Sequence, residues 1–211
     1  ARRIRAEAEH TARKLDHLQR VIAALSAAHT PQQVAAVILE QGAPLLGAFG
    51  GLLAMRDGDD VALVAGTGFP DEMLRRHSRY PAAAHLPNTD ALRTGEPVWI
   101  RGIADVEERY PHLLGLYREL DLRGWASVPL SVGGQVLGVL GLAFHEEQAF
   151  VEDDRQYILA LAHKCAQALD RARLYDSERQ LRAQAEETAA MLDTLIEANP
   201  AAIAFLDPEL R

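Results

Sequence analysis

The chain has 211 residues, of which 48% are hydrophobic and 25% are charged, a composition typical of a globular domain with extensions. Its formal net charge of −8 argues against a nucleic-acid partner, because phosphate binding needs a concentrated basic surface. No run of about eighteen apolar residues occurs, so we expect neither a transmembrane segment nor a membrane contact. The single cysteine, Cys165, excludes an internal disulfide and is compatible with a reducing, cytoplasmic location.

The first 29 residues carry the pattern of a paired helix. The sequence begins with Ala-Arg-Arg, without Met or a signal-peptide pattern, so we expect a piece of a longer protein. A helix lying on its own domain has a wider apolar stripe than this segment shows, so the narrow heptad pattern favours contact with a second helix. A helix packed on its own domain remains the alternative. The seam has alternating steps of four and three residues: Ile4, Ala8, Thr11, Leu15, Leu18, Ile22 and Leu25.

The middle of the chain alternates between short helix and strand signals. Thr30 and Pro31 predict the start of a helix, with Thr30 as N-cap and Pro31 in the first turn. Strands are predicted at 51–55 and 61–66, joined by a turn rich in Asp and Gly. The segments that follow are short helices at 71–77 and 89–93, a strand at 97–100, and a helical stretch at 105–120 interrupted near Pro111.

The stretch around Gly133 and Gly134 could be a phosphate-binding loop or the turn of a β-hairpin. A phosphate loop needs Lys and Ser or Thr after its last glycine, but Val139 and Leu140 stand there after Gly138. Runs with strand character flank the Gly-Gly pair on both sides. The pattern therefore predicts a hairpin with a primed turn.

Residues 151–199 form one helical pattern without Pro or Gly. Its first part carries a stripe wide enough to pack on a sheet: Ile158, Leu161, Cys165, Ala168, Leu169 and Ala172. Its second part narrows to a heptad seam: Leu174, Glu178, Leu181, Ala185, Thr188, Leu192 and Leu195. Such a helix would be about 70 Å long, more than a domain of this size can cover, so the far half needs another partner.

The two terminal seams together predict a parallel homodimer with helices from both ends of the chain at the interface. The residues expected there are Leu15, Leu18, Ile22, Leu25, Leu174, Leu181, Ala185, Leu192 and Leu195.

Four stretches, in this order and spacing, resemble the GAF domain, a small-molecule-sensing and dimerising module of signalling proteins: Thr94–Val98, Ser127–Leu130, Gly138–Leu140 and Phe150–Asp154. Met191–Arg211 resembles the opening of a PAS domain. The order is typical of bacterial sensor histidine kinases of two-component systems, and of some phosphatases and diguanylate cyclases. The expected divisions are an N-terminal signalling helix at 1–29, a GAF domain at 30–173, a C-terminal signalling helix at 174–198 and the start of a truncated PAS domain at 199–211.

The resemblance implies an α+β fold. A central antiparallel sheet of five or six strands, entered at its centre through Thr94–Val98, would have helices on both faces and long coiled-coil helices at both ends. The terminal helices would cover one face, and the other would carry a ligand pocket lined from Phe69 to Trp125. Aromatic and basic side chains there suit a small anionic or aromatic ligand. The candidates are His77, His85, Trp99, Arg101, Tyr110, His112, Tyr117 and Trp125.

Three functions remain open for this chain. The first is a regulatory domain without catalysis of its own, which relays a signal to downstream PAS and output domains. The second is a sensor for haem or another chromophore. The spacing of His77, His85 and His112 matches no short metal motif, however, and no metal site is predicted. The third is a dimerising module that binds no ligand.

Other chemistries that the resemblance suggests lack their key residues. Cys165 lies on the apolar stripe of the long helix, so it is expected to be a buried hydrophobic residue and not a bilin attachment site. His163 is followed by Lys164, not by the acidic residue of a kinase phosphoacceptor. The cyclic-nucleotide signature is broken at Arg155, where that signature has Glu.

Overall fold

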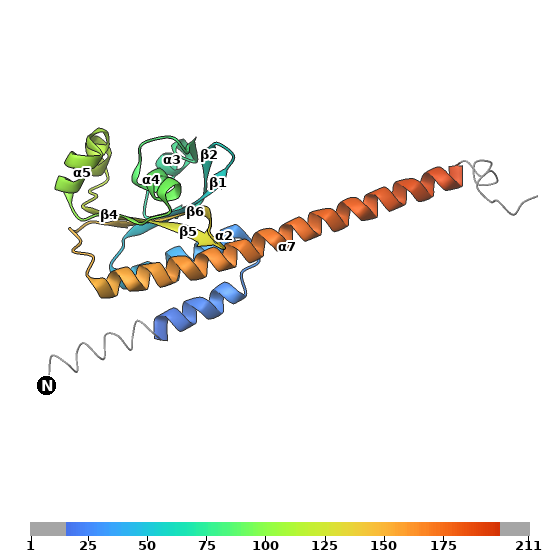
Figure 1. The fold of residues 1–211 in the computed structure, drawn as a ribbon, viewed down its shortest axis with the longest axis horizontal. Coiled ribbons are helices and arrows are strands. Elements are labelled where there is room, and N and C mark those ends of the chain that lie inside the picture. Colours follow the sequence, from blue (N-terminus) through green and yellow to red (C-terminus); the bar gives the residue numbers. More distant parts are fainter. Residues whose placement is uncertain (1–15, 199–211) are drawn as a thin grey trace, which may run out of the picture. The chain divides into compact units, whose positions relative to one another are not determined.

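The computed structural model describes residues 16–198 of the chain. The chain divides into two compact units, the first ending at Ala172 and the second beginning at Arg173. The first unit is an α+β domain with one antiparallel sheet and helices on both faces (Figure 1), as the sequence predicted. Among the described residues, no helix has both the length and the apolar character that a membrane span requires.

The sheet has six strands in the order β3-β2-β1-β6-β5-β4. All neighbouring strands are antiparallel, and the β1–β6 pair lies at the centre of the sheet. The strands are β1 (Gly50–Asp57), β2 (Asp60–Thr67), β3 (Arg79–Pro81), β4 (Val98–Ile100), β5 (Gly124–Val132) and β6 (Gln135–Phe144).

The Gly-Gly stretch is the turn of the β5–β6 hairpin. Gly133 and Gly134 have φ angles of 58° and 82°, and Val132 pairs with Gln135 across them. Two consecutive positive φ angles define a type I′ turn, whose twist matches that of the flanking strands. The prediction of a hairpin is confirmed, and no phosphate loop is formed here.

One face of the sheet is covered by helices from both ends of the domain (Figure 1). Thr30 caps the first of them as predicted, because its Oγ1 accepts a 3.2 Å hydrogen bond from the backbone N–H of Gln33. The predicted stripe from Ile158 to Ala172 is buried in the same core as Leu140 and Leu142 of β6. The covering elements are helical residues 16–26, α2 (Pro31–Val37), η1 (Ile38–Gly42), η2 (Pro44–Leu46) and the part of α7 (Glu152–Ala198) that belongs to the first unit.

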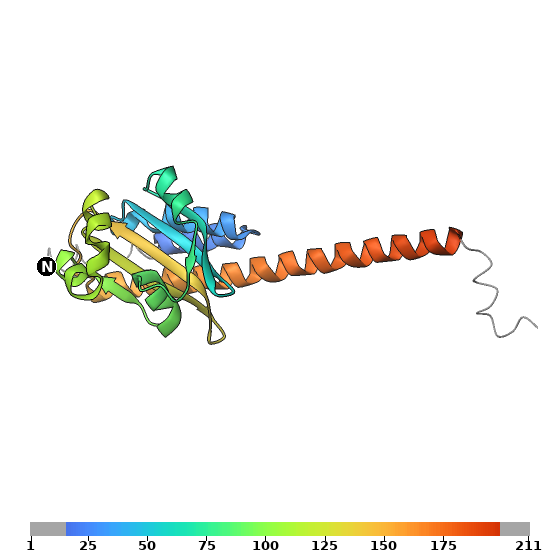
Figure 2. The same ribbon diagram turned by 90° about the horizontal axis from the view of Figure 1, so that it is seen from above.

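The opposite face carries five short helical segments. In Figure 2, α3 and α4 lie on this same face, near opposite edges of the sheet. Because both faces are covered, β5 and β6 are buried over most of their length and do not alternate between apolar and polar residues. The segments are α3 (Asp71–Arg76), α4 (Pro87–Thr94), α5 (Ile103–Arg109), η3 (Pro111–Leu113) and α6 (Leu114–Glu119).

One expectation about the strands is wrong, and one strand was not predicted. The sequence analysis did not find β3, because three residues ending in Pro81 are too short to show a periodic pattern; β3 forms by pairing with the edge of β2. Thr94–Val98 leads into β4, which is an edge strand and not a central one. Gly95 ends α4 with a φ of 72°, and this left-handed position lets the chain turn directly into β4.

The N-terminal helical residues pack on their own domain. Val21 and Leu25 are buried in the core that α7 shares, and Arg171 donates a 2.9 Å hydrogen bond to the carbonyl of Leu25. Leu25 therefore lies inside the domain and not on a free face, while Leu18 and Ile22 are half-buried. The predicted seam residues up to Leu15 lie outside the described residues.

The second unit is described as helix from Arg173 to Ala198, as the sequence predicted. Its large apolar side chains are exposed: Leu174 and Leu181 are each 65% exposed, Leu192 is 54% and Leu195 is 56% exposed. Ala185 is exposed as well. The expected PAS start at 199–211 lies outside the described residues.

Candidate functional site

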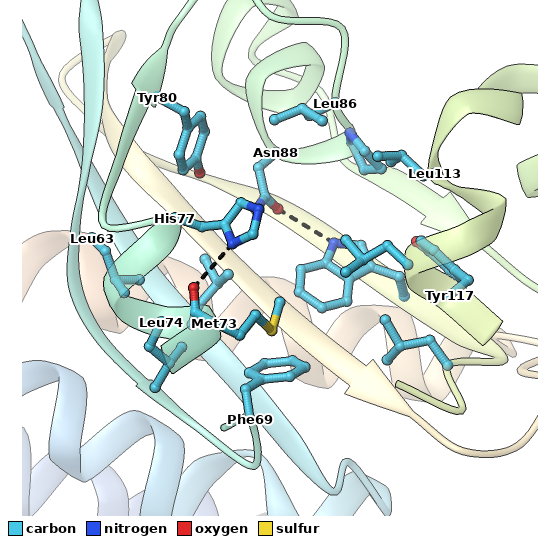
Figure 3. Close-up of a pocket in the computed structure, with 15 residues that line it drawn as sticks. Leu63, Phe69, Met73, Leu74, His77, Tyr80, Leu86, Asn88, Leu113 and Tyr117 are labelled. Carbon is cyan, nitrogen blue, oxygen red and sulfur yellow. Dashed lines mark hydrogen bonds between the residues drawn. The ribbon is translucent and has the colours of Figure 1, made fainter. Parts of the chain in front are cut away.

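A cavity of about 180 Å³ lies between the sheet and the short helices (Figure 3). Its floor comes from strands β1, β2 and β5, and its walls come from α3, α4 and the η3–α6 segment. Of the eight predicted ligand-binding residues, three line it: His77, Tyr117 and Trp125. The other lining residues are Leu52, Leu63, Phe69, Met73, Leu74, Tyr80, Leu86, Pro87, Asn88, Leu113, Leu116 and Leu122.

The cavity wall is almost entirely uncharged. No Arg, Lys, Asp or Glu is among its lining residues. His77 stands at the cavity, and its Nδ1 lies 2.9 Å from the carbonyl oxygen of Met73. Because a carbonyl can only accept, the ring N–H at Nδ1 donates to this oxygen. The lining residues therefore include no Arg or Lys that would pair with an anionic ligand.

A buried polar chain runs beneath the cavity from Trp125 through Ser127 to Asn88. The indole Nε1–H of Trp125 donates to Ser127 Oγ at 2.7 Å, and this hydroxyl donates to Asn88 Oδ1 at 2.6 Å. The indole also lies 3.3 Å from Asn88 Oδ1. An indole N–H can only donate, so the amide atom facing it is the oxygen, and the amide nitrogen of Asn88 is directed away from this pair.

Gly141 of β6 makes room for this arrangement. A Cβ atom at this position would lie 2.5 Å from Cζ2 of Trp125 and 3.3 Å from Oδ1 of Asn88. Any larger residue would push the indole from its place. The absence of a side chain at Gly141 thus positions both Trp125 and Asn88 against the sheet.

Tyr80 of β3 is the polar residue of the cavity that lacks a partner. Its hydroxyl oxygen is buried and makes no hydrogen bond with any described residue. Burial raises the pKa of Tyr80 above its ordinary value, and the nearby Asn88 amide opposes this rise. In Figure 3 the hydroxyl end of Tyr80 is directed toward Asn88. An unsatisfied buried hydroxyl costs about 1–3 kcal/mol, which a suitable ligand atom would recover.

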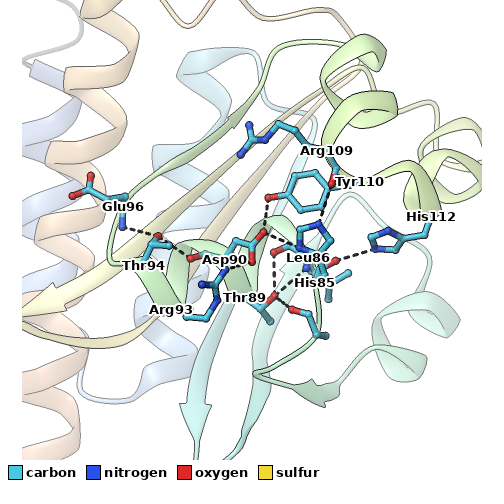
Figure 4. A network of polar contacts seen from close by, with 11 residues as sticks. His85, Leu86, Thr89, Asp90, Arg93, Thr94, Glu96, Arg109, Tyr110 and His112 are labelled. Atoms are coloured by element: carbon cyan, nitrogen blue, oxygen red, sulfur yellow. Dashed lines mark hydrogen bonds and ion pairs between the residues drawn. The ribbon is translucent and has the colours of Figure 1, made fainter.

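Three other predicted ligand residues form a separate polar cluster on α4, α5 and η3 (Figure 4). Asp90 lies at its centre and accepts a 2.8 Å hydrogen bond from the hydroxyl of Tyr110. His85 has Nδ1 at 3.1 Å from Asp90 Oδ2 and Nε2 at 3.0 Å from the carbonyl oxygen of Arg109. The Nε2 of His112 lies 2.9 Å from the carbonyl oxygen of His85. The hydrogen bonds of this cluster connect α4, α5 and η3. None of these four side chains lines the cavity.

The remaining two predicted residues also lie outside the cavity. Trp99 faces the opposite side of the sheet, because its neighbours Val98 and Ile100 point to the cavity side. Its ring lies tilted against Phe150, with 5.1 Å between the ring centroids. Arg101 is exposed and forms a bidentate pair with Asp105. Side-chain alternation along β4 explains why Trp99 does not line the cavity. The i,i+4 ion pair with Asp105 explains why Arg101 does not.

The residues of this site do not fit a haem. The three candidate histidines do not converge, since His77 lines the cavity while both ring nitrogens of His85 already lie against oxygen atoms of Asp90 and Arg109. The cavity is smaller than the pockets of about 300–1,000 Å³ that hold drug-sized ligands, and a tetrapyrrole needs at least such a space. Between residues 16 and 198, no three His, Cys, Asp or Glu side chains gather as a metal site would require.

Cys165 is fully buried on α7, on the opposite side of the sheet from the cavity. Burial raises the pKa of its thiol well above the ordinary range, so the reactive thiolate is suppressed. It has the place of a small apolar core residue, as the sequence predicted, and it cannot reach a molecule in the cavity.

The sequence patterns did not indicate two of the polar residues that order the site, Asn88 and Ser127. One signal for them was available. Ser127 interrupts an apolar strand and is fully buried, and a buried polar residue in such a strand requires a hydrogen-bonding partner. Asn88, its partner, is 39 residues away in sequence, and only the fold brings the two together.

An antiparallel sheet with packed helices on one face and a cavity under short helices on the other defines the structural class of this α+β domain. The sequence comparisons give the family. The GAF domain model matches residues 28–170, and the chain belongs to this family. None of the curated protein sequences compared with the chain matches it significantly.

Solved structures share this fold at low sequence identity. The GAF domain of a phosphoenolpyruvate-protein phosphotransferase from Coxiella burnetii is 21% identical, with a TM-score of 0.66 over 78% of this chain and 96% of that one. The corresponding domain from Acinetobacter is 17% identical, with a TM-score of 0.65 over 78% and 97%. A domain assigned to a two-component sensor histidine kinase from Sinorhizobium meliloti 1021 is 18% identical, with a TM-score of 0.54 over 70% and 92%.

Proposed function

We propose that the chain is the sensory input module of a dimeric signal-transduction protein of the histidine kinase type. In this proposal a small molecule binds in the cavity, and the domain itself performs no catalysis. The bound state is relayed through α7 to PAS and output domains that follow in the parent protein. The protein acts in the cytoplasm.

The observation that carries the proposal is the chemistry of the cavity. Apolar walls with a few fixed polar groups are the usual design of a small-molecule site. Here the Trp125–Ser127–Asn88 chain holds the polar floor in place, and the Tyr80 hydroxyl has no hydrogen-bond partner among residues 16–198. A cavity that only completed the core would be filled by side chains, because protein interiors are close-packed.

A route from the cavity to α7 exists within the first unit. Trp125 and Ala126 are neighbours on β5, and their side chains point to opposite faces of the sheet. Trp125 lines the cavity, while Ala126 belongs to the core that includes Leu161 and Leu169 of α7. A ligand that shifts the indole therefore moves the strand on which α7 packs.

A thermal-shift screen of small metabolites with the purified chain tests the proposal. We expect at least one compound to raise the melting temperature, because a ligand that binds the native state stabilises it. Met73→Trp should fill the cavity and abolish the shift, whereas Met73→Leu, which keeps the volume, should retain it. If no compound acts on either protein, the alternative of a dimerising module without a ligand is favoured.

The haem-sensor alternative has a separate and simple test. The purified chain would absorb in the Soret region after reconstitution with haem, and this band would depend on His77. We expect no such band, because the cavity provides neither the space nor a second histidine.

A further inference from the structure

The cavity also restricts the chemical class of its ligand, an inference that rests on the proposed function. We infer that the site binds an uncharged, single-ring aromatic molecule that carries one oxygen substituent, such as phenol or 4-cresol. Size, wall chemistry and the unpartnered hydroxyl each support one part of this description.

The size of the cavity limits the ligand to one ring. Its volume is about 180 Å³, and an apolar cavity of about 150 Å³ in another protein binds benzene. A benzene ring with one or two small substituents therefore fits, whereas a nucleotide or a fused tetrapyrrole does not.

The walls select an aromatic and uncharged molecule. The rings of Phe69, Tyr80, Tyr117 and Trp125 border the cavity, and offset or edge-to-face ring pairs contribute about 0.5–1.5 kcal/mol beyond area burial. No lining residue carries a fixed charge, so an ionised ligand would lose its hydration without a counter-charge. Phenol, with an ordinary pKa near that of a tyrosine side chain, about 10, enters as the neutral molecule.

The position of the oxygen follows from Tyr80 and Asn88. The hydroxyl of Tyr80 is buried and makes no hydrogen bond within the described part of the chain, and the Asn88 amide oxygen already accepts from Ser127 and Trp125. This end of the cavity is left with the Tyr80 O–H as a donor. It needs an acceptor, and a ring oxygen supplies one while the ring itself lies against Phe69 and Trp125.

Equilibrium binding of four single-ring probes to the chain tests this assignment: 4-cresol, phenol, toluene and benzoate. We expect 4-cresol and phenol to bind, toluene to bind about tenfold more weakly than 4-cresol, and benzoate not to bind. Tyr80→Phe should weaken 4-cresol about tenfold, the loss expected for one buried hydrogen bond, and leave toluene unchanged. The matched control is Tyr157→Phe, which removes a buried hydroxyl on the opposite face of the sheet and should leave 4-cresol binding unchanged.

The outcomes separate this inference from the proposed function. If toluene binds as tightly as 4-cresol, or if Tyr80→Phe does not weaken 4-cresol, the oxygen-recognition step is wrong. If none of the four probes binds while a compound of another class gives a shift that Met73→Trp abolishes, the aromatic assignment is wrong and the sensory function is retained. If nothing binds at all, both proposals fail. Circular dichroism of Tyr80→Phe confirms that the variant is folded.

Discussion

The hydroxyl of Tyr110 donates a 2.8 Å hydrogen bond to Oδ2 of Asp90, and this contact joins the end of α5 to α4 beside the cavity. The Asp90 side chain is only 14% exposed and also pairs with Arg93 at 2.8 Å and with His85 at 3.1 Å. Asp90 lies two residues after Asn88, the polar floor of the cavity. The cluster therefore holds in place the helix that presents Asn88.

Replacing Tyr110 with Phe should destabilise the domain by about 1.5–3 kcal/mol, because a hydrogen bond to a buried charged group is lost. Urea unfolding followed by circular dichroism measures this change. Arg93→Gln is the matched comparison, because Arg93 contacts the same carboxylate from an exposed position, and such surface pairs contribute about 0–1 kcal/mol. If Tyr110→Phe and Arg93→Gln lowered the free energy of unfolding equally, burial would not strengthen the hydrogen bond between Tyr110 and Asp90.

The stability of the domain should fall in acid, in part through Asp90 and Asp105. Burial acts to raise the pKa of Asp90, but the hydrogen bonds from Arg93 and Tyr110 outweigh it and hold this pKa below its ordinary value. The hydrogen bond from Arg101 likewise lowers the pKa of Asp105. A lowered pKa in the folded state contributes stability above the unfolded-state value of about 3.9, and this contribution is lost as the pH falls through the folded value.

Urea unfolding between pH 3 and pH 7 tests this dependence. Asp90→Asn should be less stable than the natural chain at pH 7, and the difference should shrink toward pH 3, where the natural carboxylate is protonated. Asp71→Asn on α3 serves as a comparison for the loss of one surface charge. A constant difference between Asp90→Asn and the natural chain across this range would contradict the assignment.

Alanine substitutions at two glycines test the turn of the β5–β6 hairpin, one at the turn itself and one in a helix as a comparison. Gly134 has a φ of 82°, so Gly134→Ala should destabilise the domain by about 1–2 kcal/mol, the cost of a left-handed L-residue. Gly115 lies in α6 with open space around its Cβ position, so Gly115→Ala should stabilise the domain by about 0.5–1 kcal/mol. Thermal unfolding of both variants measures these changes. A Gly134→Ala variant as stable as Gly115→Ala would contradict this account.

The elements of the fold were predictable where a local pattern fixes them. Thr30 and Pro31 determine a helix start, Gly133 and Gly134 determine a hairpin, and the stripe along α7 shows which side faces the core. β3 was not predictable, because it is held by pairing with β2 and not by its own sequence. The same holds for the edge position of β4, which depends on strand order.

The site was predictable only in part, for a related reason. His77 and Tyr117 line the cavity from the segment that covers the sheet, and Trp125 lines it from β5. Trp99 was misplaced because its residue type suits a pocket wall, while its orientation follows from strand alternation. The contact between Asn88 and Ser127 joins residues far apart in sequence, and no local pattern reports it.

The second unit should form a parallel two-helix coil through its seam. Leu181 and Leu192 are both exposed in the single chain, and heptad spacing places them on one stripe. Leu181→Glu combined with Leu192→Glu should give a monomer in sedimentation at micromolar concentration. Ala190→Glu, on the face opposite the seam, should remain a dimer. If the natural chain sediments as a single monomeric species, this prediction is wrong.

The seam also contains two polar positions, Glu178 and Thr188, and these suggest how the helix could switch. In a parallel dimer each Glu178 would meet its own copy, so like charges would weaken that layer. The Thr188 hydroxyl donates a 2.8 Å hydrogen bond to the carbonyl of Gln184, so it can lie in a seam without an unpaired donor. The seam is offset from the stripe that ends at Ala172, which places a change of local winding near residues 173–175.

We therefore expect a coil with two registers of similar free energy, biased by the state of the GAF domain. Allosteric coupling requires only about 1–3 kcal/mol, which polar seam layers can set. Glu178→Leu combined with Thr188→Leu should raise the melting temperature of the dimer and hold the output of the parent protein in one state. Glu187→Leu with Ala190→Leu, away from the seam, is the control and should leave signalling intact. A normal response from the seam variant would exclude a register-based relay, because its coil would have lost the alternative register.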